Sequence, residues 1–423
     1  MALLARYVKA RAALAFRMSL QCSGWFGVKL IMRCDVPRNA GQQQIGMPTI
    51  LTVIGTRPEA IKMAPLIRRL QSTPNLSVIV CSSGQHREMI KQVFDLFSIQ
   101  PDEDLAVMRP DQKLSELTAQ VVTGMETIVA KYRPDRVLVH GDTTTTMATA
   151  LAAYYQKIPV GHVEAGLRTG NIYAPWPEEM NRRIADAICD RLYAPTASAR
   201  DNLLAEGVVP SNIIVTGNTV IDALFDIIRG PLAEPAKQQE LRARFPFFDD
   251  QIKTILVTCH RRESYGDGFR DVCAALAKLA ARPGVQIVFP IHRNPNVRAA
   301  FSILGDVPNV KLIEPLDYLD FVYAQSKSYF ILTDSGGVQE EAPSLGKPVL
   351  VMRSVTERPE AVSAGTVKLV GTNTDMIVST ALELIENNTA YSAMTAVHNP
   401  YGDGKACERI IVSILQDFDH ARQ

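Results

Sequence analysis

The sequence predicts an α/β protein with two doubly wound parallel sheets that face a common cleft. From Met47 onward, apolar runs of about five residues alternate with segments of helical periodicity, which is typical of βαβ units. The alternation is interrupted at 229–235 by a segment with Gly230, Pro231 and Pro235, and then resumes. Polar residues gather directly after the apolar runs, at the strand ends where open α/β sheets bind ligands.

Each apolar run is predicted to be a strand, and its unbroken apolar character predicts burial on both faces. The predicted strands before the interruption are 49–54, 77–81, 136–140, 160–163, 191–194 and 213–215. Those after it are 254–258, 286–290, 310–313, 329–333, 348–352 and 367–370. We therefore expect one domain over 47–228, a second over 229–400 and a closing segment over 401–423.

The segment 1–46 differs in composition, with seven Lys or Arg residues against the single acid Asp35. It contains no apolar run long enough to span a bilayer and no clear small-residue cleavage site, so it predicts neither a membrane span nor a signal peptide. We expect 1–46 to be a non-native or over-long start that is poorly ordered and irrelevant to the chemistry.

Composition excludes several classes of protein. The chain of 423 residues is 47% hydrophobic, enough for two cores. Its 45 basic and 44 acidic residues give no global field for nucleic acid or a membrane surface. The seven cysteines form no CxxC pair, which favours reduced thiols in the cytoplasm and argues against a structural zinc site. No metal is predicted.

The first predicted strand ends in a turn with anion-binding character. Gly55 to Pro58 leads into a helix, and Pro58 suits the first helical position. Free N–H groups there, together with Arg57, favour a phosphate. The turn lacks GxGxxG and GxxxxGK[ST], so it predicts neither nicotinamide binding nor NTP hydrolysis, and no cofactor is expected. The alternative is an ordinary βα turn with a surface arginine.

Three carboxylates follow strands of the first predicted domain. Asp142 comes after 136–140, although it could simply cap the next helix. Glu164 directly follows 160–163, and Glu178 follows Trp176 between two prolines. Burial that raises a carboxyl pKa is plausible for Glu164 and Glu178, with solvated loop carboxylates as the alternative.

The second predicted domain gathers positive charge and glycines. His260 leaves a strand with two arginines behind it, whereas His292 could equally be structural. Gly336 and Gly337 precede a helix predicted over 338–345, where backbone N–H groups can approach a diphosphate closely. Glu341 could accept hydrogen bonds from ribose hydroxyls or be a solvated helix carboxylate.

These residues belong to eight motifs that together resemble the non-hydrolysing UDP-N-acetylglucosamine 2-epimerases of bacteria. In chain order the motifs are GTRPEAIKMAPL, HGDTTTT, GHVEAGLRTG, PWPEE, HRRES, DSGGVQEEAPSLGKPVL, TERPE and HNPYGDG. The resemblance covers essentially everything after Met47. It implies the glycosyltransferase-B architecture, with two Rossmann-like domains, a C-terminal helix that crosses back to the first, and usually a homodimer. It also implies interconversion of UDP-N-acetylglucosamine and UDP-N-acetylmannosamine for cell-surface polysaccharide.

The resemblance assigns a role to each matching position. It places Arg57 and Lys62 at the nucleotide and diphosphate side, and Ser335, Gly336 and Gly337 on the diphosphate, with Glu341 on the ribose. Asp142, Glu164, Glu178 and His260 become catalytic candidates around the sugar. Gln85, His86 and Arg87 match a loop that binds a second substrate molecule as an activator. Cys259 and Arg293 depart from the family pattern, and Arg293 leaves the contacts of the His292 loop in doubt.

The chemistry explains why such groups are needed. No carbonyl neighbours the hydrogen on the second carbon of the sugar, so direct deprotonation is implausible. Elimination of UDP, followed by reprotonation on the other face and return of UDP, needs two acid/base groups and positive charge on the leaving diphosphate. The order in which Asp142, Glu164 and Glu178 act is not readable from sequence.

Three other functions compete with this one. A hydrolysing relative would release UDP and free N-acetylmannosamine, and a glycosyltransferase of the same architecture would need an acceptor pocket. A regulator that binds a nucleotide sugar without turnover is the third. The three carboxylates argue against the regulator, because a pure binder of an anionic ligand gains nothing from burying acids near the diphosphate.

Overall fold

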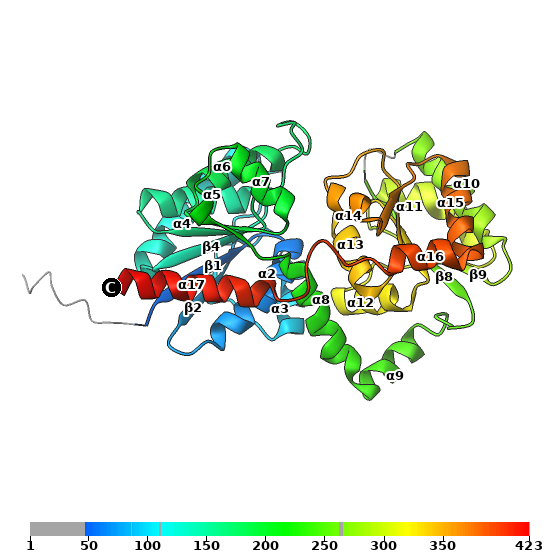
Figure 1. The fold of residues 1–423 in the computed structure, drawn as a ribbon, viewed down its shortest axis with the longest axis horizontal. Helices are drawn as coiled ribbons and strands as arrows, with labels where there is room; N and C mark the ends of the chain where they lie inside the picture. The colour runs from blue at the N-terminus through cyan, green and yellow to red at the C-terminus, as the bar shows by residue number, and fades with distance from the viewer. Residues whose placement is uncertain (1–46, 86, 110, 262–264, 423) are drawn as a thin grey trace, which may run out of the picture. The chain divides into compact units, whose positions relative to one another are not determined.

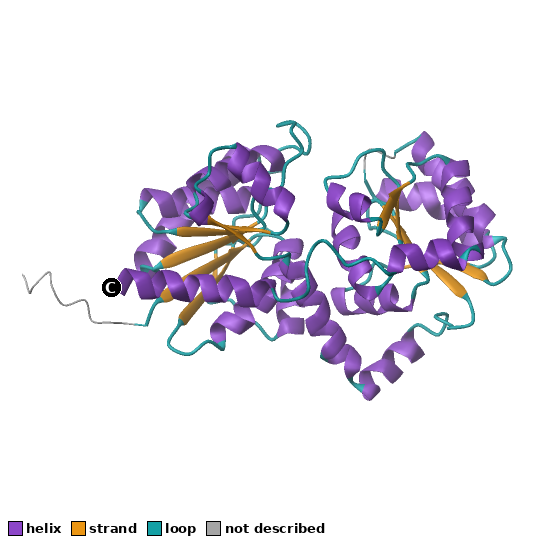
Figure 2. Ribbon diagram, in the orientation of Figure 1, coloured by secondary structure: helices purple, strands orange, loops and turns teal. Residues whose placement is uncertain are grey.

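The computed structural model describes residues 47–85, 87–109, 111–261 and 265–422, which form two parallel sheets (Figure 1 and Figure 2). The first sheet has seven strands in the order β3-β2-β1-β4-β5-β6-β7, and the second has six in the order β10-β9-β8-β11-β12-β13. Every pairing described is parallel. The predicted fold of two doubly wound sheets is confirmed. The extension 1–46 lies outside the described residues, so its predicted disorder stays a prediction.

The strands of the first sheet are β1 (Thr49–Ile54), β2 (Ser77–Ser82), β3 (Glu103–Asp104), β4 (Arg136–His140), β5 (Val160–Val163), β6 (Arg191–Ala194) and β7 (Ile213–Val215). Those of the second are β8 (Lys253–Thr258), β9 (Val285–Pro290), β10 (Val310–Ile313), β11 (Phe330–Thr333), β12 (Val349–Val351) and β13 (Val367–Leu369).

The helices around the first sheet are α2 (Arg57–Gln71), α3 (Arg87–Phe97), α4 (Leu114–Tyr132), α5 (Thr144–Tyr155), α6 (Glu178–Ile188), α7 (Ala197–Ala205), η1 (Pro210–Asn212) and α8 (Thr219–Arg229). There follow η2 (Pro231–Ala233), α9 (Pro235–Arg244), α10 (Asp267–Ala280), α11 (Pro295–Phe301), η4 (Ser302–Asp306), α12 (Tyr318–Lys327), α13 (Gly336–Glu341), η5 (Ala342–Leu345), α14 (Pro359–Ala364), α15 (Thr374–Glu386), α16 (Asn388–Thr395) and α17 (Ala406–Arg422). Within the described chain, no helix has both the length and the apolar composition needed to cross a bilayer.

Both sheets are covered by helices on both faces, because their strands are apolar on both faces. Successive side chains of a strand point to opposite sides. In β1, Ile50 and Ile54 belong to one core, and Leu51 and Val53 belong to the core on the other face. The second sheet repeats this arrangement with its own pair of cores, formed from alternate residues of β8. The burial that the unbroken apolar runs predict is therefore confirmed.

Strand order determines where ligands can bind. In the first sheet β1 lies between β2 and β4. The chain adds β2 and β3 on one side of β1 and then adds β4 to β7 on the other side. In the second sheet β8 lies between β9 and β11 in the same way. Connections diverge at such switch points, and a crevice opens at the carboxyl ends of the two central strands.

The predicted strands agree with the structure to within one residue at each end. The two-residue β3 was missed, because Glu103 and Asp104 give no apolar signal. The helix predicted over 338–345 begins earlier, at Gly336, and changes to a 3₁₀ turn at Ala342. Pro343 explains the change, because it cannot donate the hydrogen bond that would continue an α-helix. The interruption at 229–235 contains η2 and the start of α9 rather than an open loop.

The last helix, α17, drawn in red in Figure 1, contacts α2 and α8 of the first half of the chain. Asp222 of α8 fixes its start, since its carboxylate accepts the N–H groups of Ala406 and Cys407, both at 3.1 Å. Near the other end, Asp417 accepts hydrogen bonds from Arg191 and Arg136. The helix is thus held to the first half at both ends.

We predict that Asp222→Ala loosens α17, because two buried N–H groups lose their acceptor. Loss of a helix cap costs about 1 to 2 kcal/mol, which corresponds to roughly 5- to 30-fold faster amide exchange over 406–422. Hydrogen exchange followed by mass spectrometry measures this. Glu408→Ala is the matched control, since it removes an exposed acid from the first turn of the same helix. Equal exchange in the two variants would contradict the capping role.

Candidate active site

A cavity of about 920 Å³ lies where loops that follow strands of the first sheet face loops that follow strands of the second. Its lining contains every catalytic and substrate-binding candidate that the sequence predicts: Arg57, Lys62, Asp142, Glu164, Glu178, His260, Ser335, Gly336, Gly337 and Glu341. Asp142, Glu164, His260 and Ser335 lie in the loops that follow β4, β5, β8 and β11, and the other candidates lie on α2, α6 and α13. The cavity therefore occupies the place that both switch points predict.

The turn after β1 satisfies its own backbone donors. The N–H groups of Gly55 and Thr56 donate to Glu59 Oε2 at 2.7 and 2.6 Å. The hydroxyls of Thr143 and Thr146 donate to the other carboxyl oxygen at 2.5 and 3.1 Å. The prediction of free N–H groups at this turn is therefore wrong for Gly55 and Thr56, because the Thr-x-x-Glu capping box supplies their acceptor.

Arg57 is what this turn contributes to the cavity. It is the first residue of α2, with Pro58 second rather than first, and its guanidinium donates to the carbonyl of Leu316 at 3.3 Å. Burial lowers its pKa, while the carboxylates of Asp317 and Glu341 oppose that shift. Its side chain thus reaches from the first half of the chain to residues of the second.

Lys62, one turn further along α2, lies between two buried carboxylates. Its ammonium forms an ion pair with Glu164 and lies 3.1 Å from Glu340 Oε2. Burial would raise the pKa of Glu164, but the charge of Lys62 outweighs it and holds that pKa well below its usual range. Glu164 is therefore held ionised. Lys62 is partnered by carboxylates, although the family resemblance places it at the diphosphate side.

The backbone of Glu164 is strained. Its φ is +68°, in the left-handed region that non-glycine residues rarely adopt. Its N–H donates to the carbonyl of Tyr193 at 3.1 Å, and Asn218 donates to its carboxylate at 2.6 Å. Such strain persists only where the surroundings hold it, and it is concentrated at functional sites.

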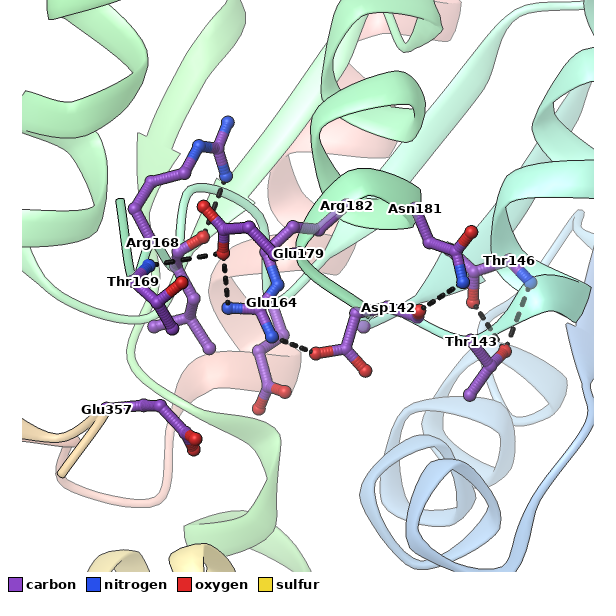
Figure 3. A network of polar contacts seen from close by, with 12 residues as sticks. Asp142, Thr143, Thr146, Glu164, Arg168, Thr169, Glu179, Asn181, Arg182 and Glu357 are labelled. Atoms are coloured by element: carbon purple, nitrogen blue, oxygen red, sulfur yellow. Dashed lines mark hydrogen bonds and ion pairs between the residues drawn. The ribbon is translucent and has the colours of Figure 1, made fainter. Parts of the chain in front are cut away.

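Asp142 is held by α6 (Figure 3). Arg182 forms an ion pair with its carboxylate, and the amide of Asn181 donates to its backbone carbonyl at 3.0 Å. On the same helix, Glu179 accepts the N–H of Thr169 at 3.1 Å. The N-cap residue of the following helix, α5, is Thr143 and not Asp142.

Glu178 is the first residue of α6 and is half-buried at the cavity wall. Burial raises its pKa, and the charges of Asp142 and Glu357 add to this. It therefore differs from Glu164, whose pKa moves the other way. The cavity combines a carboxyl group that is held ionised with one that binds a proton more readily than usual.

His260 is positioned by Asp334, which follows β11. Asp334 Oδ2 accepts the backbone N–H groups of His260 and Arg261 at 2.6 and 2.7 Å. The imidazole of His260 stacks on that of His292, with ring centroids 5.3 Å apart. The structure thus brings together two histidines that the sequence treats separately. Arg262 lies outside the described residues.

The glycine turn after β11 and Glu341 complete the far wall. Ser335 is the N-cap residue of α13, and the guanidinium of Arg358 packs against Gly336. Glu341 is buried and accepts hydrogen bonds from Tyr318 at 2.9 Å and Gln325 at 3.0 Å. Burial raises the pKa of Glu341 to about 7. The alternative of a solvated helix carboxylate is therefore wrong.

The predicted activator loop does not line this cavity. Gln85 accepts a hydrogen bond from Thr145 at 3.4 Å, and Arg87 forms an exposed ion pair with Asp104 at 3.0 Å. His86 lies outside the described residues. The allosteric role of this loop stays a prediction.

Sequence reasoning missed several residues that surround the candidates. Arg358 is an example, since it binds Glu340 at 2.8 Å and Glu357 at 3.2 Å. The motif TERPE contains it, but no residue in that motif was singled out. Arg182 could have been found, because it lies one helical turn after Glu178. The residues missed are His140, Arg182, Asn218, Tyr318, Asp334, Glu340, Glu357 and Arg358. Among the residues described, no group of three or more His, Cys, Asp or Glu side chains is arranged to hold a metal ion.

Comparison with known proteins identifies the family. A family model described as UDP-N-acetylglucosamine 2-epimerase matches residues 68–415. The chain belongs to the UDP-N-acetylglucosamine 2-epimerase family. It is 55% identical over 367 residues to the UDP-N-acetylglucosamine 2-epimerase of Escherichia coli K12, which covers 86% of this chain and 98% of that protein. It is also 55% identical over 374 residues to a probable epimerase of Ralstonia nicotianae, covering 88% of this chain and 100% of the relative.

Solved structures of the epimerase family share the fold. The Neisseria meningitidis epimerase bound to UDP-GlcNAc is 51% identical, with a TM-score of 0.83 over 87% of this chain and 100% of that one. The Methanocaldococcus jannaschii epimerase in complex with UDP-GlcNAc and UDP is 33% identical, with a TM-score of 0.74 over 87% and 99%. The predicted family and the predicted glycosyltransferase-B type of fold are confirmed.

We predict that Glu341 makes stability depend on pH. Its folded-state pKa of about 7 lies above the value of an unfolded glutamate, so the folded protein binds its proton more tightly. Stability that is fully present at low pH is therefore lost as pH rises toward and past 7. Glu341→Gln cannot ionise, so its stability relative to the parent protein should rise by about 2 to 3 kcal/mol between pH 5 and pH 8. Thermal unfolding at both pH values measures the difference, and a constant difference would refute it.

Proposed function

We propose that this chain interconverts UDP-N-acetylglucosamine and UDP-N-acetylmannosamine in the cavity described above, without hydrolysing them. The observation that carries the proposal is the presence in one cavity of a buried carboxyl group, Glu164, and a half-buried one, Glu178, whose pKa values shift in opposite directions. Family membership supports the same conclusion. Two related solved structures, from Neisseria meningitidis and Methanocaldococcus jannaschii, contain UDP-GlcNAc.

The reaction proceeds by elimination and readdition. A carboxylate takes the proton from the second carbon of the sugar, the electron pair of that bond forms the double bond to the first carbon, and UDP leaves with the electrons of the anomeric C–O bond. A proton then adds to the other face of the second carbon as a diphosphate oxygen of UDP returns to the first. The net change is inversion of one centre, so no oxidant or cofactor is consumed.

The two faces of the sugar need different groups. Glu178 binds a proton more readily than an ordinary glutamate, because burial raises its pKa. Glu164 and Asp142 are both paired with cations, Lys62 and Arg182, and the pairing holds the pKa of Glu164 well below its usual range. We propose that Glu178 acts on one face of the sugar and that Asp142 or Glu164 acts on the other face.

The leaving diphosphate needs positive charge and backbone donors. We propose that Arg57 and His260 supply the charge and that the turn of Ser335, Gly336 and Gly337 supplies N–H groups, with Glu341 accepting from the ribose. Lys62 contributes through Glu164 rather than directly. Because both halves of the chain line the cavity, they can hold UDP and the unsaturated sugar together and exclude water between the steps.

Other properties that the family resemblance implies stay proposals. We propose a homodimer, an activator site near Gln85 and Arg87, and a cytoplasmic role in polysaccharide synthesis. The five cysteines described are unpaired and buried, which fits a reducing compartment. The domain limits 47–228, 229–400 and 401–423 are proposed on the same basis, and the packing of α17 on α2 and α8 supports the last of them.

We predict that incubation with UDP-N-acetylglucosamine in heavy water yields UDP-N-acetylmannosamine with deuterium at the second carbon of the sugar. The proton that adds to the other face comes from a second acid/base group whose proton exchanges with solvent, so the product carries deuterium. Proton and phosphorus NMR follow both sugars and UDP. Accumulation of UDP and free sugar would instead show a hydrolase, and bound but unchanged ligand would show a regulator.

We also predict that Glu178→Gln lowers kcat by about 10²- to 10⁴-fold, the usual contribution of a general acid or base. Its affinity for UDP, measured by calorimetry, should stay within a few-fold of that of the parent protein, because the proposed diphosphate contacts are made by other residues. Glu383→Gln, which changes an exposed glutamate of α15, is the control and should leave kcat unchanged. A kcat for Glu178→Gln within a few-fold of normal would remove Glu178 from the mechanism.

A further inference from the structure

Two buried residues of the first sheet and its helices take no part in the chemistry just described. His162 lies in β5 and Asp186 in α6, with 0% and 3% of their surfaces exposed. Imidazole Nδ1 lies 2.6 Å from Asp186 Oδ1, and Nε2 lies 2.7 Å from the carbonyl oxygen of Gly141. Neither side chain lines the cavity, so any effect on the reaction is indirect.

Both ring nitrogens of His162 face acceptors. A backbone carbonyl can only accept, and an ionised carboxylate can only accept. Each nitrogen must therefore carry a hydrogen, which makes the ring an imidazolium paired with a carboxylate. Burial favours the neutral form of Asp186, but the charges of His162 and Arg168 outweigh it and hold the pKa of Asp186 below its usual range.

The pair connects two loops that carry catalytic candidates. Through His162 it holds the carbonyl of Gly141, the residue directly before Asp142. Through its other carboxyl oxygen, Asp186 accepts the N–H of Gly166 at 3.2 Å and contacts Arg168 at 2.8 Å. Gly166 lies two residues after Glu164. One carboxyl group thus reaches the loop after β4 by way of His162 and the loop after β5 directly.

We propose that Asp186 and His162 are positioning residues whose charged pair fixes the loop of Asp142 relative to the loop of Glu164. Both loops need such a restraint. The left-handed backbone of Glu164 is strained and persists only where other contacts hold it. The backbone of Gly166 packs closely against the carbonyl of Ala199, so closely that a Cβ at this position would collide with it.

Other titratable groups around the pair are compatible with this charge state. Arg168 is shared between Asp186 and Glu206, so its charge is balanced on both sides. Burial raises the pKa of Cys189 well above its usual value, which keeps that thiol neutral. Burial also lowers the pKa of His140 to about 3, and the charge of Lys62 adds to this shift. His140 is thus neutral at neutral pH.

The proposal rests on the proposed epimerase activity, and it is tested with Asp186→Asn, His162→Gln and the double variant. Asparagine keeps the shape of Asp186 without its charge, and glutamine can keep the hydrogen bond to Gly141 but not the one to Asp186. We expect each single variant to lower kcat by roughly 10- to 100-fold, because a shift of about 1 Å in a catalytic group has an effect of this size. KM and the affinity for UDP should stay within a few-fold of those of the parent protein, since the proposed nucleotide contacts lie elsewhere.

The double variant should have a kcat only slightly lower than that of either single variant, because both residues act through one chain of hydrogen bonds.

Asp417→Asn is the matched control. It replaces a mostly buried aspartate that binds Arg136 and Arg191 at the far end of α17 and lines no part of the cavity. We expect it to lower thermal stability and leave kcat unchanged. If Asp186→Asn and His162→Gln behave in the same way, losing stability but not kcat, the two residues are merely structural and the proposal is overturned.

A second measurement needs no enzymatic activity. Long-range proton–nitrogen NMR of the parent protein with labelled histidine should show one imidazole with both ring nitrogens protonated at neutral pH, and His162→Gln should remove that signal. A neutral His162 ring would overturn the charged pair even if the variants are slow. If the parent protein shows the imidazolium but no epimerisation, the proposed function fails while the charged pair stands.

Discussion

The buried ammonium group of Lys62 is the interaction on which the cavity depends. It faces Glu164 from the first half of the chain and Glu340 from the second, and all three side chains are nearly inaccessible to solvent. Removing one partner of such a buried group leaves an uncompensated charge, which costs about 3 to 5 kcal/mol. The ion pairs therefore tie the two halves together at the bottom of the cavity. They also keep Glu164 ionised while no ligand is bound.

The topology explains why residues so distant in sequence meet there. In each sheet the first strand is an interior one, and the chain adds later strands first on one side of it and then on the other. Each sheet therefore has a switch point at the carboxyl ends of two neighbouring strands. Arg57 and Asp142 leave β1 and β4 at the first of these points, and His260 and Ser335 leave β8 and β11 at the second. The candidate site residues lie in the segments that the fold brings together after these strands. The apolar residues of the strands themselves are buried in the hydrophobic cores.

Sequence could predict most of this, for a definite physical reason. Strands buried on both faces must be continuously apolar, so their positions and the polar residues that follow them are visible without a structure. What could not be predicted is the choice of partners. The capping of Gly55 by Glu59, the stacking of His260 on His292 and the pairing of Lys62 with Glu340 depend on side-chain geometry between elements that the sequence does not place in register. Composition did not reveal β3, because an edge pair of two acidic residues has no apolar pattern.

The distribution of charge explains how several acids can surround a site built for an anionic ligand. Asp142 is paired with Arg182, Glu164 with Lys62, and Glu340 with both Lys62 and Arg358, so these acids present little net negative charge to a diphosphate. Such pairing also weakens Glu164 as a base until a ligand disturbs the pair. Glu178 differs, because burial and neighbouring acids raise its pKa toward the range where it can both give and take a proton. The structure thus distinguishes acids that are paired with cations from Glu178, whose pKa is raised, and α6 carries both Glu178 and the Arg182 that holds Asp142.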